Sequence, residues 1–167
     1  MKETLKRALC VLCFTLSVAP ALGALELTDI EKQYLKIFPE AGSVGQADYK
    51  DGRYYPVMDK SGKQCGLIIY TEKKGYEGPI KIIVGLDLDA HIVNYLMSQR
   101  ETPHYVSEII KPEFKERFKG KGKEQLRFKK DDPAGEIDAV TGATVTSRAL
   151  LDGLREAATL AEEILKK

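Results

Sequence analysis

Residues 138–147 read Asp-Ala-Val-Thr-Gly-Ala-Thr-Val-Thr-Ser and lead into an amphipathic stretch that extends to Lys166. Apolar side chains recur at helical spacing over 147–166, which predicts a long helix with one broad buried face. Gly142 allows a sharp turn just before this helix, and Thr144 places a hydroxyl beside its start. Because N–H groups at a helix start lack intrahelical partners and favour anions, the stretch predicts a turn suited to a phosphate.

The same residue types also have an ordinary structural use. Thr, Ser and Gly in front of a helix are common capping and turn residues, so a lone Thr-Gly-Ala-Thr occurs without any ligand. The chemistry of residues 141–144 therefore leaves two interpretations open, a structural turn and a ligand-binding turn.

The segments upstream of this turn predict a sheet. Three apolar runs rich in β-branched residues predict strands, over 64–71, 80–88 and 92–99. A turn is expected at 73–75, and a second one at 87–91, where a short connection containing Asp favours an antiparallel hairpin.

Shorter elements complete the prediction. Local patterns predict helices over 29–38 and 112–118 and one helical turn over 107–110, while residues 41–63 predict a loop with at most one short strand. The fold class is therefore α+β, with a mainly antiparallel sheet flanked by helices and a long C-terminal helix after the turn at Gly142.

The N-terminus has the pattern of an export signal. Lys2, Lys6 and Arg7 precede an apolar run over 8–24 that ends in small residues. This pattern predicts a secretory signal peptide over 1–23, and a single membrane anchor is the alternative. Either one predicts a periplasmic or other extracytoplasmic location for a single domain over 24–167.

Composition narrows the classes of function. A formal net charge of +1 gives no signature of nucleic-acid binding. Residues 25–167 contain no Walker-type loop, no His-Glu-x-x-His and no Cys-x-x-Cys, and the separated His91 and His104 do not predict a metal site. Residues 111–130 hold nine basic side chains, which fit either a docking face or a solvated helix and loop, since acidic residues are interleaved.

Residues 138–144 resemble the flavinylation motif D-x-x-[ST]-G-A-[ST] of the FMN-binding domain family. This family includes the G subunit of the Rnf electron-transport complex and the C subunit of the Na⁺-translocating NADH:quinone reductase. Residues 75–80 (Gly-Tyr-Glu-Gly-Pro-Ile) and 100–103 (Arg-Glu-Thr-Pro) agree with the family in order and spacing. The resemblance spans roughly residues 64–165.

The resemblance implies a covalent cofactor. It implies that FMN is joined through its phosphate to Thr144 by a separate flavin transferase, which recognises Asp138 as part of the motif. Gly142 and Ala143 leave room for the bulky group, and Thr141 is a neighbour of the acceptor. Asp138 also fits an ordinary loop or capping residue, and this alternative stays open.

The resemblance further implies that Glu101 and Thr102 lie near the flavin ring. The family has glycines at two positions that follow, and this chain has His104 and Val106 there. Both replacements restrict the backbone, so the loop is expected to hold the ring differently. His104 is either a flavin contact or a surface histidine of the loop.

These features predict an exported electron carrier with FMN on Thr144 that passes electrons between redox proteins or a membrane electron-transport complex. It would act as a carrier or as a subunit of an ion-translocating oxidoreductase complex rather than as an enzyme on its own. Two alternatives stay open: a module that binds flavin or a partner without a covalent cofactor, and a structural subunit of a membrane complex.

Overall fold

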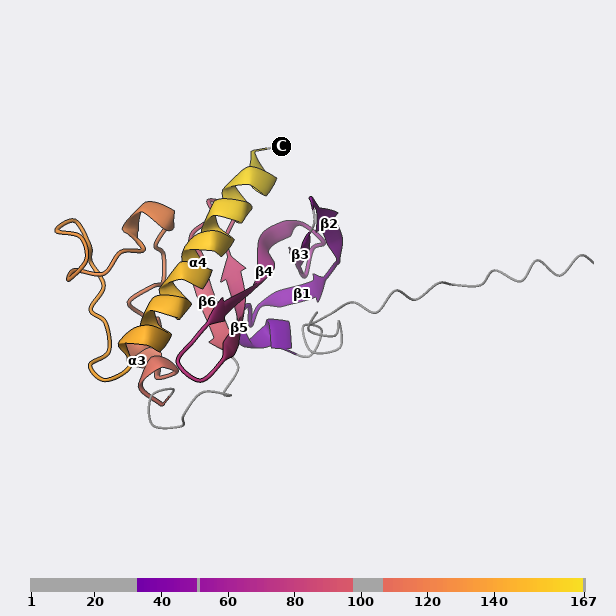
Figure 1. Ribbon diagram of the computed structural model, residues 1–167. Helices are drawn as coiled ribbons and strands as arrows, with labels where there is room; N and C mark the ends of the chain where they lie inside the picture. Colours follow the sequence, from indigo (N-terminus) through magenta and orange to yellow (C-terminus); the bar gives the residue numbers. More distant parts are fainter. Residues whose placement is uncertain (1–32, 51, 98–106, 167) are drawn as a thin grey trace, which may run out of the picture.

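The computed structural model of the chain describes residues 33–50, 52–97 and 107–166 (Figure 1). Its named strands all pair antiparallel, and a long helix ends the chain. The bounds are η1 Tyr34–Lys36, β1 Ala41–Val44, β2 Ala47–Tyr49, β3 Gly52–Asp59, β4 Gln64–Lys74, β5 Pro79–Leu86, β6 Ile92–Met97, α3 Pro112–Lys115, η2 Lys123–Gln125 and α4 Thr144–Leu165.

The strands form one sheet with the order β1-β3-β4-β5-β6, and β2 also pairs with β3. Figure 1 shows α4 running along one face of this sheet. The main core lies between them and contains fully buried side chains from both layers, among them Leu67, Ile69, Ile82, Leu150 and Leu154. The predicted α+β fold, with an antiparallel sheet and a long C-terminal helix, is therefore confirmed.

The central strands follow the predicted pattern. The runs predicted over 64–71, 80–88 and 92–99 form β4, β5 and β6, although residues 98 and 99 lie outside the described part. The turn predicted at 73–75 begins later than expected, at Gly75. Lys73 and Lys74 stay in β4 because they pair with the first residues of β5.

Residues 41–63 were wrongly predicted as mostly loop, because they contain three strands. β1 and β2 pair with the two halves of β3, and Gly45 sits at the break between them, where its N–H donates to the carbonyl of Pro56 at 2.9 Å. Short polar strands at a sheet edge carry little alternating pattern, and pairing with β3 supplies the order that their local sequence does not specify.

Two helix predictions need correction. α3 ends at Lys115 instead of continuing to 118, and the chain goes on in turns until Gly120, whose φ is +72°. Of the helix predicted over 29–38, residues 33–36 are helical and include η1, the helix ends before Ile37, and the residues up to 32 lie outside the described part. The helical turn predicted over 107–110 is confirmed at residues 107–109.

The last helix is confirmed and begins three residues earlier than predicted, at Thr144. Gly153 brings it close to the sheet, since a Cβ at this position would lie 2.5 Å from Ile82 Cδ1 and 2.9 Å from Thr71 Oγ1. The Thr71 hydroxyl donates to the Gly153 carbonyl at 3.4 Å. This close approach holds α4, and with it the turn in front of Thr144, against β4 and β5.

Within the described residues, no helix combines the length and the apolar character needed to cross a membrane. The segment predicted as a signal peptide or anchor, residues 1–23, lies outside the described part of the chain.

Candidate functional site

The predicted attachment turn is a tight turn that runs directly into α4. The N–H of Ala143 donates to the carbonyl of Val140 at 3.1 Å, and Gly142 has φ +83°, a conformation that favours glycine. Thr144 is the first residue of the helix, and Ala143, at the N-cap position, has no side-chain hydrogen bond to the helix start. The first-turn N–H groups and the positive end of the helix dipole therefore lie beside the Thr144 hydroxyl.

A second turn contributes to the same place. The β4–β5 turn is closed by a hydrogen bond from the N–H of Gly75 to the carbonyl of Gly78 at 2.7 Å. Tyr76 projects from it and is 68% exposed. Together with residues 142–146, Tyr76 lines a cavity of about 190 Å³. The fold therefore brings the β4–β5 turn against the turn that carries Thr144.

This cavity fits one end of a phosphate-bearing cofactor. Typical ligand pockets hold about 300–1,000 Å³, so 190 Å³ is enough for a phosphate and part of a sugar chain only. Val145 is 51% exposed and, like Tyr76, offers an apolar surface at the rim. A flat ring system can lie on that rim, outside the cavity.

The motif residues differ in their relation to the cavity. Gly142, Ala143 and Thr144 line it, whereas Asp138 and Thr141 do not. The Asp138 carboxylate is 61% exposed and pairs with Lys129 Nζ at 2.8 Å. Thr141 is exposed at the tip of the turn.

Three of the predicted site residues cannot be placed. Glu101, Thr102 and His104 lie outside the described residues, and so does Val106. Their expected position near a flavin ring stays a prediction.

Tyr76 and Val145 were missed as site residues in the sequence. The signal for Tyr76 was present, since it lies between two glycines of the resembling stretch 75–80, but only the fold places it beside Thr144. Val145 was not recognised because an apolar residue in the first turn of a helix is usually assigned to the buried face.

Larger clefts of about 400 and 420 Å³ lie elsewhere on the protein. The first runs along α4 and is lined mainly by paired charges, such as Arg127 with Asp132 and Arg148 with Asp131. The second lies beside β6 and the residues around α3. Neither cleft is lined by a predicted site residue. The smaller cavity at Thr144 is therefore the better candidate for the cofactor site.

The basic segment 111–130 is largely engaged within the fold. Six of its nine basic side chains pair with a carboxylate of the same chain: Lys111, Lys119, Lys121, Lys123, Arg127 and Lys129. Lys115 donates to the carbonyl of Tyr95 at 2.9 Å, and burial lowers the pKa of its ammonium group. Arg117 donates to the carbonyl of Asp138 at 3.2 Å. These contacts favour the solvated, internally paired interpretation over a docking face.

Comparison with known proteins identifies the fold and the cofactor. The family model described as FMN-binding domain matches residues 75–159, just over half of the chain and including both turns of the site. The chain belongs to the FMN-binding domain family. Membership implies FMN as the cofactor, and the predicted resemblance to this family is confirmed.

Several curated proteins resemble this FMN-binding domain. The G subunit of the proton-translocating ferredoxin:NAD(+) oxidoreductase complex of Clostridium ljungdahlii is 34% identical over 59% of this chain and 54% of its own length. The G subunit of the ion-translocating oxidoreductase complex of Methanosarcina acetivorans is 28% identical over 85% of this chain and 81% of its own. The G subunit of the ion-translocating oxidoreductase complex of Aliivibrio fischeri MJ11 is 36% identical over 58% of this chain and 50% of its own length. The match thus spans about half the length of the first and third relatives.

A solved structure has the same fold. The crystal structure of NqrC from Shewanella oneidensis superposes on the FMN-binding domain with a TM-score of 0.55, at 24% identity, covering 77% of this chain and 70% of that one. At this level of identity the likeness concerns the fold.

Proposed function

We propose that this protein is an exported electron carrier that holds FMN as a phosphoester on Thr144. One observation carries the proposal: the hydroxyl-bearing Thr144 is the first residue of α4 and lines a cavity together with Gly142 and Ala143. Small neighbours leave the threonine accessible to the transferase, and the helix start favours the negative charge of the phosphodiester.

The attachment needs no base within this chain. In the transfer, Thr144 Oγ1 gains a bond to the phosphorus of an FMN group that is supplied as a phosphoanhydride, such as a flavin dinucleotide. The anhydride P–O bond breaks, and the nucleoside monophosphate leaves with the hydroxyl proton; a separate flavin transferase catalyses the step. The exposed Asp138, held by Lys129, is accessible to such an enzyme, which supports its proposed role in recognition.

When bound, FMN supplies the oxidation and reduction chemistry. The protein supplies the tether at Thr144, the positive end of the α4 dipole beside the phosphate, and a surface for the ring at Tyr76 and Val145. A covalent tether also keeps the cofactor from diffusing away outside the cytoplasm. The shallow cavity leaves the ring near the surface, where a redox partner can approach it.

The proposed partners and location follow from the relatives and from the N-terminus. The curated relatives are named as G subunits of ion-translocating oxidoreductase complexes, which supports a place for this chain in such a complex or beside one. The basic and apolar pattern of residues 1–23 supports export, either with cleavage of a signal peptide or with retention of a membrane anchor.

The decisive experiment is a comparison of Thr144→Ala with the wild type, each produced with and without a flavin transferase. Intact mass and peptide mapping should show a gain of one FMN less one water on the wild-type peptide that contains Thr144, only when the transferase is present. Thr144→Ala should carry no adduct and keep its melting temperature within a few degrees, because alanine has a high helix propensity (a difference of roughly 0.5 kcal/mol).

Thr141→Ala is the matched control, since it removes a threonine hydroxyl from the same turn but outside the cavity. It should keep the adduct. Covalent FMN on Thr144→Ala protein would disprove the assignment of the acceptor. A wild-type chain that is never modified but binds flavin reversibly would favour the non-covalent module instead.

A further inference from the structure

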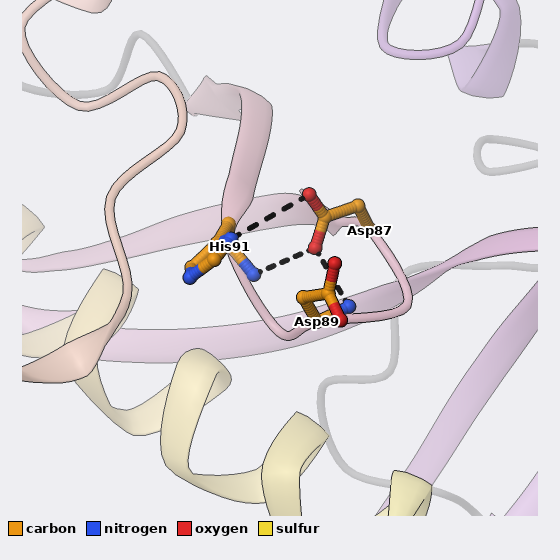
Figure 2. Close-up of side chains that lie close together, drawn as sticks. All are labelled: Asp87, Asp89 and His91. Atoms are coloured by element: carbon orange, nitrogen blue, oxygen red, sulfur yellow. Dashed lines mark hydrogen bonds and ion pairs between the residues drawn. The ribbon is translucent and has the colours of Figure 1, made fainter.

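Three potential metal ligands meet at the β5–β6 turn. The side chains of Asp87, Asp89 and His91 each offer one ligand atom, and these atoms lie within 4.8 Å of one another. Figure 2 shows the two carboxylates and the imidazole gathered at the turn. The group combines a nitrogen donor with two oxygen donors, a set that transition metals such as Zn²⁺ accept.

Of the three side chains, only the Asp87 carboxylate is needed to close the turn. Its Oδ1 accepts hydrogen bonds from the N–H groups of Asp89 and His91, both at 2.9 Å, and its own N–H donates to the carbonyl of His91 at 3.0 Å. These bonds close the turn through the Asp87 carboxylate and the backbone of the other two residues. They use neither the Asp89 carboxylate nor the imidazole of His91.

The β3–β4 turn provides an internal comparison. Asp59 Oδ1 accepts from the N–H groups of Ser61 and Lys63 at 2.7 and 3.0 Å, and the Asp59 N–H donates to the carbonyl of Lys63 at 2.8 Å. The fourth residue has positive φ in both turns, +83° at Gly62 and +61° at Ala90. The same backbone turn therefore forms with Ser and Lys where the β5–β6 turn has Asp89 and His91.

The imidazole of His91 is turned toward the carboxylates. Its Nδ1 lies 3.8 Å from Asp87 Oδ2, the carboxylate oxygen that the backbone N–H groups do not use. The opposite edge of the ring faces Gly122, where a Cβ would lie 3.1 Å from Cδ2 and 3.5 Å from Nε2. Gly122 thus leaves room for the ring to pack with Nδ1 directed at Asp87.

We propose that Asp87, Asp89 and His91 bind a divalent transition metal of the Zn²⁺ class. Zn–N and Zn–O bonds of about 2.0–2.2 Å in a tetrahedral site place ligand atoms about 3.3 Å apart. The 3.8 Å between Asp87 and His91 needs only a small closure, and both side chains are about two-fifths exposed and free to make it. A cation there also neutralises the two neighbouring carboxylates. Three protein ligands leave a fourth position for water.

This site is separate from the attachment site for FMN. The β5–β6 turn follows Leu86 at one end of β5, whereas Tyr76 and the cavity at Thr144 lie beyond Pro79 at the other end. Eight strand residues span about 25 Å. Metal binding and flavin attachment can therefore be tested independently in one protein.

The test is isothermal titration calorimetry, in which ZnCl₂ is added to the tag-free full chain near neutral pH. The wild type should bind one equivalent. Asp89→Ser with His91→Lys copies the side chains of the β3–β4 turn, so it should keep the wild-type circular dichroism and melting temperature. Its affinity for Zn²⁺ should fall at least about tenfold, since even changes in residues behind metal ligands cost about 10–100-fold.

The reciprocal change gives the matched control. Ser61→Asp with Lys63→His places the same ligand types in the β3–β4 turn, and should raise the stoichiometry to two equivalents. Absence of Zn²⁺ binding by the wild type would overturn the proposal. So would tight binding that persists in the Asp89→Ser, His91→Lys protein, because the metal would then be held elsewhere.

Discussion

Tyr76 is an exposed aromatic residue beside the predicted attachment turn. It is 68% exposed at the tip of the β4–β5 turn, so it adds little to the core, yet it lines the cavity at Thr144. Offset stacking between aromatic rings contributes about 0.5–1.5 kcal/mol. An isoalloxazine ring tethered at Thr144 would obtain this stabilisation from Tyr76.

We expect Tyr76→Ala to leave the covalent attachment intact and to free the ring. Loss of about 0.5–1.5 kcal/mol of stacking lowers the ratio of stacked to unstacked ring roughly 2- to 13-fold, so the flavin fluorescence of the modified protein should rise. Leu88→Ala is the control, since Leu88 is another exposed apolar residue, 43% exposed, in the turn at the far end of β5. Equal fluorescence in the wild type and Tyr76→Ala would show that the ring lies away from this tyrosine.

Among the elements, α4 is held by two kinds of contact. Its apolar face packs on the sheet along the helix, from Leu150 to Ala161, and comes closest at Gly153 in the middle of the helix. Its second half adds ion pairs with three separate segments: Glu156 with Lys73, Glu162 with Lys123, and Glu163 with Lys50. The predicted attachment turn thus rests on a helix that is packed against the sheet and also tied by charge to β4, η2 and the β2–β3 turn.

The ion pair between Glu162 and Lys123 predicts a contribution to the free energy of unfolding that is lost in acid. The hydrogen bond from Lys123 lowers the pKa of Glu162 below its ordinary value of 4.5, and Lys166 adds to this effect. The stabilisation is fully present above about pH 4.5 and is lost as the pH falls through the lowered pKa of the folded protein. Glu162→Gln should therefore melt slightly below the wild type at neutral pH, because a solvent-exposed ion pair contributes only modestly to stability.

Melting temperatures recorded over a range of pH measure the contribution of the Glu162–Lys123 pair to stability. The difference in melting temperature between Glu162→Gln and the wild type should narrow as the solution becomes strongly acidic. Glu116→Gln is the control, because its 3.6 Å pair with Lys119 joins neighbouring residues of one exposed segment. A difference that stays constant down to strongly acidic pH would contradict the assignment.

At the scale of the whole molecule, the two faces of the sheet are covered unequally. α4 covers one face, and the residues just after η1 cover part of the other. There the ring of Phe38 lies on two glycines of the sheet: a Cβ at Gly66 would lie 2.8 Å from the ring, and one at Gly85 would lie 2.9 Å from it. The second core cluster, which includes Ile37, Val57 and Ile68, depends on this small cover.

Phe38→Ala should destabilise the protein by about 2–3 kcal/mol, somewhat less than the 3–5 kcal/mol of a fully buried Phe→Ala change. The reason is that Phe38 is only partly buried and that the two glycines beneath it cannot fill the space left by the ring. Urea denaturation measures the difference. Leu35→Ala changes a residue of the same segment that is 48% exposed, and should stay within about 0.5 kcal/mol of the wild type. Similar losses in both variants would contradict this account of the second face.

Elements with a strong local pattern could be predicted from the amino-acid sequence alone. Apolar runs and helical spacing identified β4, β5, β6 and α4, and Gly142 marked the turn in front of the helix. The motif over 138–144 and the stretch 75–80 were enough to predict the FMN-binding domain family. These features were predictable because each depends on residues that are close together in the chain.

Contacts between residues that are distant in the sequence became visible only in the folded protein. β1, β2 and the outer edge of β3 are ordered by pairing across the sheet, and local sequence does not encode that pairing. Tyr76 lies beside Thr144 because the turn between the end of β4 and the start of β5 packs beside the start of α4. Side-chain direction likewise separated the residues of the motif, with Thr144 in the cavity and Asp138 outside it. Such contacts arise from the packing of whole elements, so no local pattern in the sequence could specify them.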